Sequence, residues 1–240
     1  MFKNISNNLK KLLAYSGFTN SKFEIPEYHF KPNFLSTHSK AIDLIEQNSN
    51  VLDIGCNDGA FLNYLKKNKN CTVKGIEKKN YIKPNEDIID HDLDTGLPDI
   101  DYNSYDFITM LDVIEHLNEP EKFIYNLRKK INNNKKTKII LTTPNIGFFP
   151  IRISLLFGNF NYSSKGILDY THKRLFTFFS FKDLLTKGGF NVENSFGIPA
   201  PFPLVLGEGL ISFLMLNINS FLIKLNKKLF SFQMFFVIKK

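Results

Sequence analysis

The feature that most constrains the fold is an alternation of short apolar runs with helical patterns between residues 40 and 145. Apolar runs of about four to eight residues between polar residues are typical of buried strands. Helical spacing follows the first run, where Phe61, Leu62 and Leu65 recur. Strands that alternate with helices join as parallel pairs through right-handed crossovers. The sequence therefore predicts an α/β fold whose mostly parallel sheet has helices on both faces.

The pattern predicts seven strands, over residues 50–56, 72–77, 87–90, 105–111, 138–143, 190–195 and 233–238. It predicts helices over residues 60–67, 121–131 and 180–187 and a helix that ends near residue 47. These elements divide the chain into an N-terminal helical cap (1–36), a core (37–199) with an insertion (146–170), an apolar helical insertion (200–232) near the C-terminus, and a final strand (233–240).

Charge and cysteine content exclude several classes of function. The net charge is +8, but the lysines are scattered or in short runs without interleaved aromatic residues, so we expect no nucleic-acid partner. Cys56 and Cys71 form no CxxC motif and no Cys/His cluster with metal-ligand spacing, so we expect no metal. Two isolated cysteines, and an N-terminus without a continuous apolar run, favour a cytoplasmic location.

The stretch 210–229 raises the question of a membrane. It is strongly apolar and has no charge up to residue 223, but Asn217 and Asn219 interrupt it. A spanning helix needs about 20 apolar residues. We therefore consider a packed core or cap helix, or peripheral contact with the inner membrane face, where Lys224 would meet anionic lipid.

A glycine-rich turn follows the first predicted strand, in the segment Val51–Gly59. Such a turn lets a ligand approach the backbone, and the next helix offers it free N–H groups. The spacing Gly55-x-x-x-Gly59 differs from the G-x-G-x-x-G that holds a pyrophosphate. Asp53 lies within the apolar strand, and a buried carboxylate is costly unless it is paired. We expect it to accept hydrogen bonds from the turn or from a ligand ammonium.

Acidic residues end the next two strands. Glu77 is placed to accept hydrogen bonds from both ribose hydroxyls of a nucleoside, although it could instead pair with Lys78 at the surface. An aspartate in the segment 91–98 can accept from the exocyclic amine of adenine, while Leu93 packs on the ring. The fourth strand ends near Leu111, at the carboxyl edge where open α/β sheets bind ligands.

In this order, the blocks resemble the motifs of class I S-adenosylmethionine (SAM)-dependent methyltransferases, especially the small-molecule branch that includes the ubiquinone-biosynthesis enzymes. Asp53–Gly59 resembles D-x-G-x-G-x-G, with Asn57 at the middle glycine. Ile114–Leu117 resembles I-E-H-L, Asp169–Thr177 resembles H-x-R-x-F-T, and Leu184–Phe190 resembles L-L-x-x-x-G-F. Because asparagine tolerates positive φ better than most residues, we expect the turn to survive.

The resemblance implies a Rossmann-like fold and SAM as the cofactor. It assigns the ribose to Glu77 and the adenine amine to Asp92. The full set of expected cofactor-binding residues is Asp53, Gly55, Cys56, Asn57, Gly59, Glu77, Lys78, Asp92, Leu93 and Leu111.

Catalysis of methyl transfer is mainly a matter of positioning, since the cofactor carries the electrophile. A hydroxyl acceptor also needs a base. His116 and His172 are the candidate catalytic residues, because histidine can titrate near neutrality. A structural role is the alternative for both, and His172 could also anchor substrate with Asp169 and Arg174.

Residues 1–36, 146–170 and 200–230 could form a lid over the acceptor. Their apolar character favours a lipid-linked glycan or a membrane-proximal substrate, whereas Lys165, His172, Lys173 and Arg174 could grip an acidic sugar or phosphate. We predict methyl transfer to a hydroxyl oxygen of a small-molecule, glycan or lipid-linked acceptor. The alternatives are a nicotinamide-dependent enzyme and a catalytically silent subunit or membrane-associated binding protein.

Overall fold

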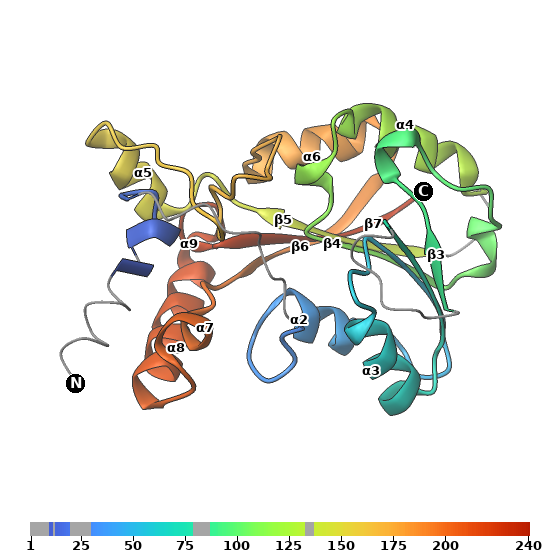
Figure 1. The fold of residues 1–240 in the computed structure, drawn as a ribbon, viewed down its shortest axis with the longest axis horizontal. Helices are drawn as coiled ribbons and strands as arrows, with labels where there is room; N and C mark the ends of the chain where they lie inside the picture. The colour runs from blue at the N-terminus through green and yellow to red at the C-terminus, as the bar shows by residue number, and fades with distance from the viewer. Residues whose placement is uncertain (1–9, 12, 20–29, 79–86, 133–136) are drawn as a thin grey trace.

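The computed structural model describes residues 10–11, 13–19, 30–78, 87–132 and 137–240. Its centre is a seven-stranded sheet with the order β3-β2-β1-β4-β5-β7-β6 (Figure 1). The strands are β1 (Asn50–Ile54), β2 (Thr72–Glu77), β3 (Ile88–Asp90), β4 (Phe107–Leu111), β5 (Lys138–Pro144), β6 (Asn191–Ile198) and β7 (Gln233–Lys239). β7 runs antiparallel to both of its neighbours, and the other pairs are parallel. The predicted Rossmann-like, mostly parallel sheet is confirmed.

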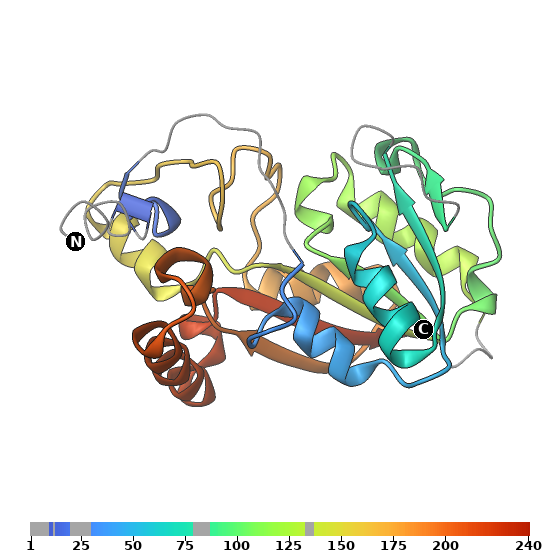
Figure 2. The same cartoon turned by 60° about the horizontal axis from the view of Figure 1, so that its bottom comes forward.

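Helices cover both faces of the sheet (Figures 1 and 2). They are α2 (Thr37–Leu44), α3 (Ala60–Lys69), α4 (Pro120–Lys130), α5 (Phe149–Leu156), α6 (Phe178–Lys187), α7 (Phe202–Leu206), α8 (Leu210–Leu225) and α9 (Lys227–Phe230). α2 and α3 pack on one face, where Ile45 and Leu65 join a cluster with Val51. α4 and α6 pack on the other, where Ile124 and Phe181 join a second cluster.

Local sequence explains where several elements begin and end. α4 begins at Pro120; a backbone N–H in the first turn of a helix has no helical acceptor, so proline loses nothing there. The last turn of α4 is basic, which is favourable at the negative end of the helix dipole. Thr177 and Ser180 form a capping box at the start of α6. The first strand ends at Ile54 rather than at residue 56, because Gly55 turns the chain with φ of 78°.

The insertions pack together beyond the carboxyl end of β5 (Figure 1). A third cluster joins Ile151 of α5 to Ile167, Leu168 and Phe232, and the ring of Tyr15 lies 6.2 Å from that of Phe232. The predicted N-terminal cap is described only in part: residues 13–15 are helical, and residues 1–9, 12 and 20–29 lie outside the described residues. Among the described helices, none has the length and apolar character to cross a membrane.

Phe181→Ala tests how far the α6 face of the core stabilises the fold. Its side chain is fully buried, with its ring centroid 5.2 Å from that of Phe236. The cavity should lower the free energy of unfolding by about 3–5 kcal/mol, as measured by urea denaturation. Phe179→Ala on the same helix is the control, because that side chain is 78% exposed and should change stability by less than about 0.5 kcal/mol. Equal losses in the two variants would contradict the packing described here.

Candidate functional site

The turn between β1 and α3 has the backbone geometry that its sequence requires. Gly55, Asn57 and Gly59 have φ of 78°, 49° and 74°, so asparagine does take a left-handed conformation at the position where the motif has glycine. A Cβ on Gly55 would lie 2.4 Å from Cγ2 of Val113, which leaves room for glycine only. The turn therefore brings bare backbone to the carboxyl edge of the sheet, directly before the N-terminus of α3.

Asp53 is buried, with 4% of its surface exposed, and it faces β4 rather than the turn. The hydroxyl of Thr109 donates a hydrogen bond of 2.6 Å to Oδ1 of Asp53. Burial raises the pKa of Asp53 to about 7; the Thr109 hydrogen bond lowers it and the charge of Glu77 raises it further. Thr109 of β4 is thus a partner that the sequence did not reveal, in place of the turn donors that we expected; a hydrogen bond from a ligand ammonium stays a prediction.

Glu77 connects the end of β2 to the glycine turn. Its Oε2 accepts a hydrogen bond of 2.8 Å from the backbone N–H of Asn57, and its Oε1 accepts one of 2.8 Å from the N–H of Lys78. Burial raises the pKa of Glu77, while these two N–H groups lower it. Each carboxylate oxygen has a second lone pair. The two oxygens can therefore accept further hydrogen bonds at the edge where the turn lies.

Lys78 and Asp92 form an ion pair of 2.6 Å above the end of β3. The ammonium of Lys78, together with the backbone N–H of Asp94, holds the pKa of Asp92 below its usual range. Asp92 also caps the short 3₁₀ helix that begins at Leu93. Both oxygens of Asp92 thus have protein partners, and an adenine amine would have to share them.

Cys56 and Leu111 lie close to the turn but differ in what they offer a ligand. Cys56 is buried, and a Cβ on Gly75 of β2 would lie 2.5 Å from its Sγ. Burial raises the pKa of this thiol, so it stays protonated. Any contact of Cys56 with a ligand is therefore expected through its backbone. Leu111 ends β4 and is half-buried at the same edge.

The structure brings His116 and His172 together, although they are far apart in the sequence. Their ring centroids lie 4.8 Å apart in an edge-to-face arrangement. Nδ1 of His116 lies 3.2 Å from the carbonyl oxygen of Thr171, and Nδ1 of His172 lies 2.9 Å from that of Ile167. Burial lowers the pKa of both histidines, that of His116 to about 4, whereas the sequence had led us to expect titration near neutrality.

Two acidic residues beside this pair were not among the predicted site residues. Glu115 has no exposed surface, and burial followed by the charge of Asp112 raises its pKa well above the usual range. Asp112 has φ of 60° and accepts hydrogen bonds from Thr142 Oγ1 (2.7 Å) and Gln233 Nε2 (2.6 Å). The spacing of Asp112 after the fourth strand was a usable signal, but the burial of Glu115 was visible only in three dimensions.

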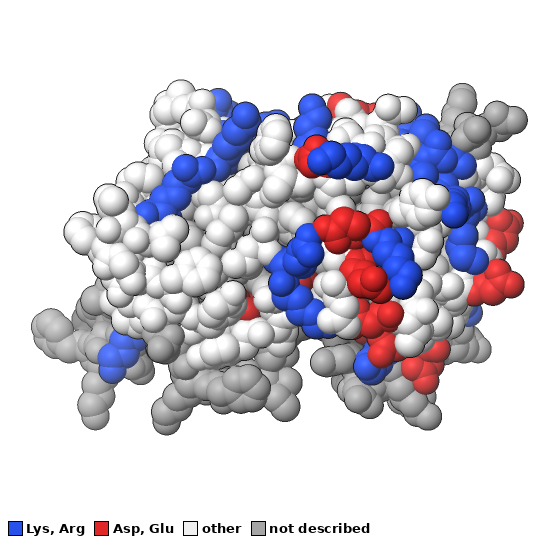
Figure 3. All heavy atoms as spheres, turned by 90° about the horizontal axis from the view of Figure 1, so that it is seen from above, with Lys and Arg blue, Asp and Glu red and all other residues white. Residues whose placement is uncertain are grey.

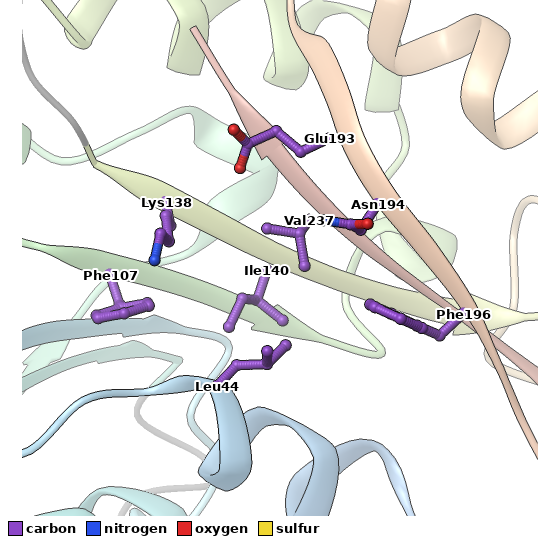
Figure 4. Close-up of a pocket in the computed structure, with 8 residues that line it drawn as sticks. All are labelled: Leu44, Phe107, Lys138, Ile140, Glu193, Asn194, Phe196 and Val237. Atoms are coloured by element: carbon purple, nitrogen blue, oxygen red, sulfur yellow. The ribbon is translucent and has the colours of Figure 1, made fainter.

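The hollow shown in Figure 4 is not part of this site. It has a volume of about 200 Å³ and lies on the sheet beside Leu44 at the end of α2, with Glu193 and Phe196 of β6 on its far side. The residues that end β1, β2 and β3 do not line it. The candidate site is defined instead by the carboxyl ends of neighbouring parallel strands, the position where open α/β sheets bind their ligands.

The family model described as methionine biosynthesis protein MetW matches residues 36–196, more than half of the chain. The chain belongs to the MetW family. That span includes the turn, Glu77, Asp92, His116 and His172. No protein matched in a search of curated sequences.

Solved structures show the same fold at low sequence identity. A SAM-dependent methyltransferase from Archaeoglobus fulgidus is 20% identical, with a TM-score of 0.56 over 84% of this chain and 90% of its own. One from Thermotoga maritima is 16% identical, with a TM-score of 0.54 over 100% and 97% of the two chains. One from Mesorhizobium loti is 12% identical, with a TM-score of 0.52 over 85% and 98%. The class I methyltransferase fold is therefore shown for this MetW-family chain.

Asp53→Asn tests whether this carboxyl is protonated in the fold near neutral pH. Because its folded pKa of about 7 lies above the unfolded value, its contribution to stability is complete below the unfolded pKa and is lost as the pH rises through 7. Between about pH 5 and pH 8, the wild-type free energy of unfolding should fall by on the order of 2 kcal/mol more than that of Asp53→Asn.

Urea denaturation at the two pH values measures this difference. Asp99→Asn is the matched control, because the Asp99 side chain is fully exposed and should leave the wild-type pH dependence unchanged. Parallel pH dependences of wild type and Asp53→Asn would show that Asp53 is already ionised in the folded chain.

Proposed function

We propose that this MetW-family chain binds SAM at the carboxyl edge of β1, β2 and β3 and transfers its methyl group to a hydroxyl oxygen. The observation that carries the proposal is the position of Glu77. Its carboxylate holds the glycine turn through Asn57 and keeps lone pairs for the two ribose hydroxyls. The family match and the shared fold support the same cofactor.

The remaining expected ligands extend the site in the same order as the strands. The adenine would lie over Leu93 beside the Lys78–Asp92 pair, and the methionine part would lie along the Gly55–Gly59 backbone. The buried carboxylate of Asp53 and the half-buried carboxylate of Glu77 favour the positively charged cofactor, since a cationic ligand offsets their partial desolvation. Leu111 would border the methyl group at the end of β4.

The histidines fit a role as proton acceptors, in spite of their lowered pKa values. A carbonyl oxygen only accepts hydrogen bonds, so Nδ1 of each ring carries the proton that faces Thr171 or Ile167. Nε2 then has the lone pair. Because burial lowers the pKa of both rings, we expect them to be uncharged and to be weak bases. A weak base removes the proton of an acceptor hydroxyl less effectively.

The topology weighs against a nicotinamide-dependent enzyme. Dinucleotide-binding sheets have the order 3-2-1-4-5-6. Here the antiparallel β7 lies between β5 and β6, and the turn lacks the G-x-G-x-x-G spacing. A catalytically silent subunit would keep this fold. An active methyltransferase forms S-adenosylhomocysteine from SAM, and a silent subunit does not.

The surface around the insertions favours a lipid-linked acceptor. Leu210, Leu214, Ile218, Phe221 and Leu225 lie three or four residues apart on α8 and are 52–87% exposed, which makes one apolar stripe. Leu155, Leu156 and Phe157 at the end of α5 are also 56–76% exposed. Figure 3 shows that acidic and basic side chains gather over the α4 side of the molecule, whereas the α5 side is mostly uncharged apart from one band of Lys and Arg.

The basic residues fit an anionic membrane surface better than a soluble anionic substrate. Lys224 lies in the last turn of α8, and Lys228 is exposed beyond it. In contrast, Lys173 and Arg174 form ion pairs with Asp94 and Glu121, so they are not held ready for a sugar or phosphate. We therefore place the acceptor at the inner membrane face, with the α8 stripe (Leu210, Leu214, Ile218, Phe221 and Leu225) in peripheral contact.

Glu77→Ala tests the cofactor assignment. Loss of two charge-assisted hydrogen bonds should weaken SAM binding by about 10- to 100-fold, measured by isothermal titration calorimetry. Glu193→Ala, in an ion pair with Lys239 on β6, is the control and should bind as wild type does. Unchanged affinity of Glu77→Ala would remove the ribose assignment, and no binding by the wild type at millimolar SAM would contradict the proposed function.

Sedimentation with vesicles that contain an anionic phospholipid tests the membrane contact. The double variant Leu214→Ser, Phe221→Ser should partition at least about tenfold less than wild type, because two exposed apolar side chains are lost. Phe179→Ser, 78% exposed on α6, is the matched control. Failure of the wild type to sediment with vesicles, or dimerisation through the same two residues, would contradict this contact.

A further inference from the structure

We propose that Glu115, His116 and His172 bind a divalent transition-metal ion. Each offers one ligand atom, a carboxylate oxygen or a ring nitrogen, and these three atoms lie within 4.8 Å of one another. The cluster forms where the segment after β4 meets the segment that precedes α6. We had expected no metal, because the sequence has no Cys/His cluster with metal-ligand spacing.

The buried carboxylate of Glu115 is the observation that points to a cation. Glu115 has no exposed surface, and neither of its carboxylate oxygens has a hydrogen-bond partner of good geometry among the described residues, although the hydroxyl of Thr143 lies close enough to lower its pKa. Its backbone carbonyl does have partners, since it accepts from the N–H groups of Lys173 and Arg174. The side chains of those two residues turn away, to Asp94 and Glu121. A carboxylate desolvated in this way is costly unless a cation binds it or it takes up a proton.

Both histidines are oriented as metal ligands commonly are. Ligating histidines usually donate the proton of one ring nitrogen to a carbonyl or carboxylate, which fixes the ring and leaves the other nitrogen for the metal. His172 Nδ1 faces the carbonyl oxygen of Ile167 at 2.9 Å, and His116 Nδ1 faces that of Thr171 at 3.2 Å. Asp169 fixes Thr171 in turn, because its Oδ1 accepts from the N–H and the hydroxyl of Thr171 at 2.8 and 2.7 Å.

The donor set indicates the class of metal. Two imidazole nitrogens with one carboxylate oxygen suit Zn²⁺, Fe²⁺ or Co²⁺, whereas Mg²⁺ and Ca²⁺ prefer oxygen ligands throughout. Three protein ligands leave positions open for water or substrate. Asp112 and Asp169 add negative charge nearby, which further favours a cation.

The position suggests a role, which rests on the proposed function. The cluster follows β4 at the edge where the methyl group is expected, so the acceptor hydroxyl could bind in an open metal position. A metal ion lowers the pKa of a bound hydroxyl, whose proton passes to solvent. The oxygen then bonds to the methyl carbon, the carbon–sulfur bond breaks, and its electron pair stays on the sulfur of S-adenosylhomocysteine. In this arrangement His116 and His172 act as metal ligands, in place of the proton-acceptor role considered under the proposed function.

Metal binding can be measured without any substrate. Full-length protein stripped with a chelator is titrated with Co²⁺, followed by visible absorption, and with Zn²⁺, followed by calorimetry. We expect one ion per chain, and at least tenfold weaker binding by Glu115→Gln and by His172→Ala. His91→Ala is the control, because His91 contacts Gly96 outside the cluster and should bind the metal as wild type does.

Glu115→Gln is nearly isosteric with wild type, so weaker metal binding by this variant is not caused by misfolding. Its melting temperature without metal should equal or exceed that of wild type, because glutamine places no charge in the core. An absence of stoichiometric binding by wild type, or equal affinities for all variants, would overturn the proposal. Glu77→Ala separates the two proposals. Its SAM binding should weaken about 10- to 100-fold while its metal binding equals that of wild type. A wild-type chain that binds metal but not SAM would contradict the methyltransferase function alone.

Discussion

The candidate site depends on the hydrogen bond between the carboxylate of Glu77 and the backbone N–H of Asn57. This bond joins the end of β2 to the turn that follows β1, and that turn leads directly into the N-terminus of α3. It is possible because β1 and β2 are parallel and in register from Asn50 and Thr72 onward, so that both strands end at one edge. It adds to the hydrogen bonds that the backbone N–H groups of Gly55 and Cys56 donate to the carbonyl oxygen of Ile76, which also hold the turn against β2.

The same edge concentrates negative charge in a poorly hydrated place. Asp53 and Glu115 are almost completely buried, and burial raises the pKa values of both, as it does that of Glu77. No Lys or Arg among the described residues forms an ion pair with these three. Carboxylates in this state favour cationic ligands, which is the common physical basis of the proposed sulfonium cofactor and the proposed divalent metal ion.

The insertions add an apolar end to this acidic edge. Segments 13–19, 146–170 and 200–232 meet around Phe232 and Tyr15, and they leave the stripe on α8 exposed. α5 and α8 both lie at the end of the molecule toward which β5 runs (Figure 1). This apolar end is the structural basis for proposing an acceptor with an apolar anchor.

The sequence by itself determined the sheet and the glycine turn. Strand and helix periods are local properties, and the positive φ of Asn57 follows from its place between Gly55 and Gly59. The ribose and adenine roles of Glu77 and Asp92 are what the family resemblance implies, and the positions of both residues at the ends of predicted strands agree with it. The lid segments were recognised by their apolar composition, but their mutual packing was not predictable because no periodic pattern links them.

Only the tertiary structure decided which side chains share an environment. The pairing of Asp53 with Thr109 depends on β1 lying next to β4, and the meeting of Glu115, His116 and His172 depends on where a loop far along the chain returns to the sheet. Burial also lowers the pKa values of His116 and His172, whereas the sequence suggested titration near neutral pH. Desolvation is a property of the assembled core, so no local sequence pattern could report it.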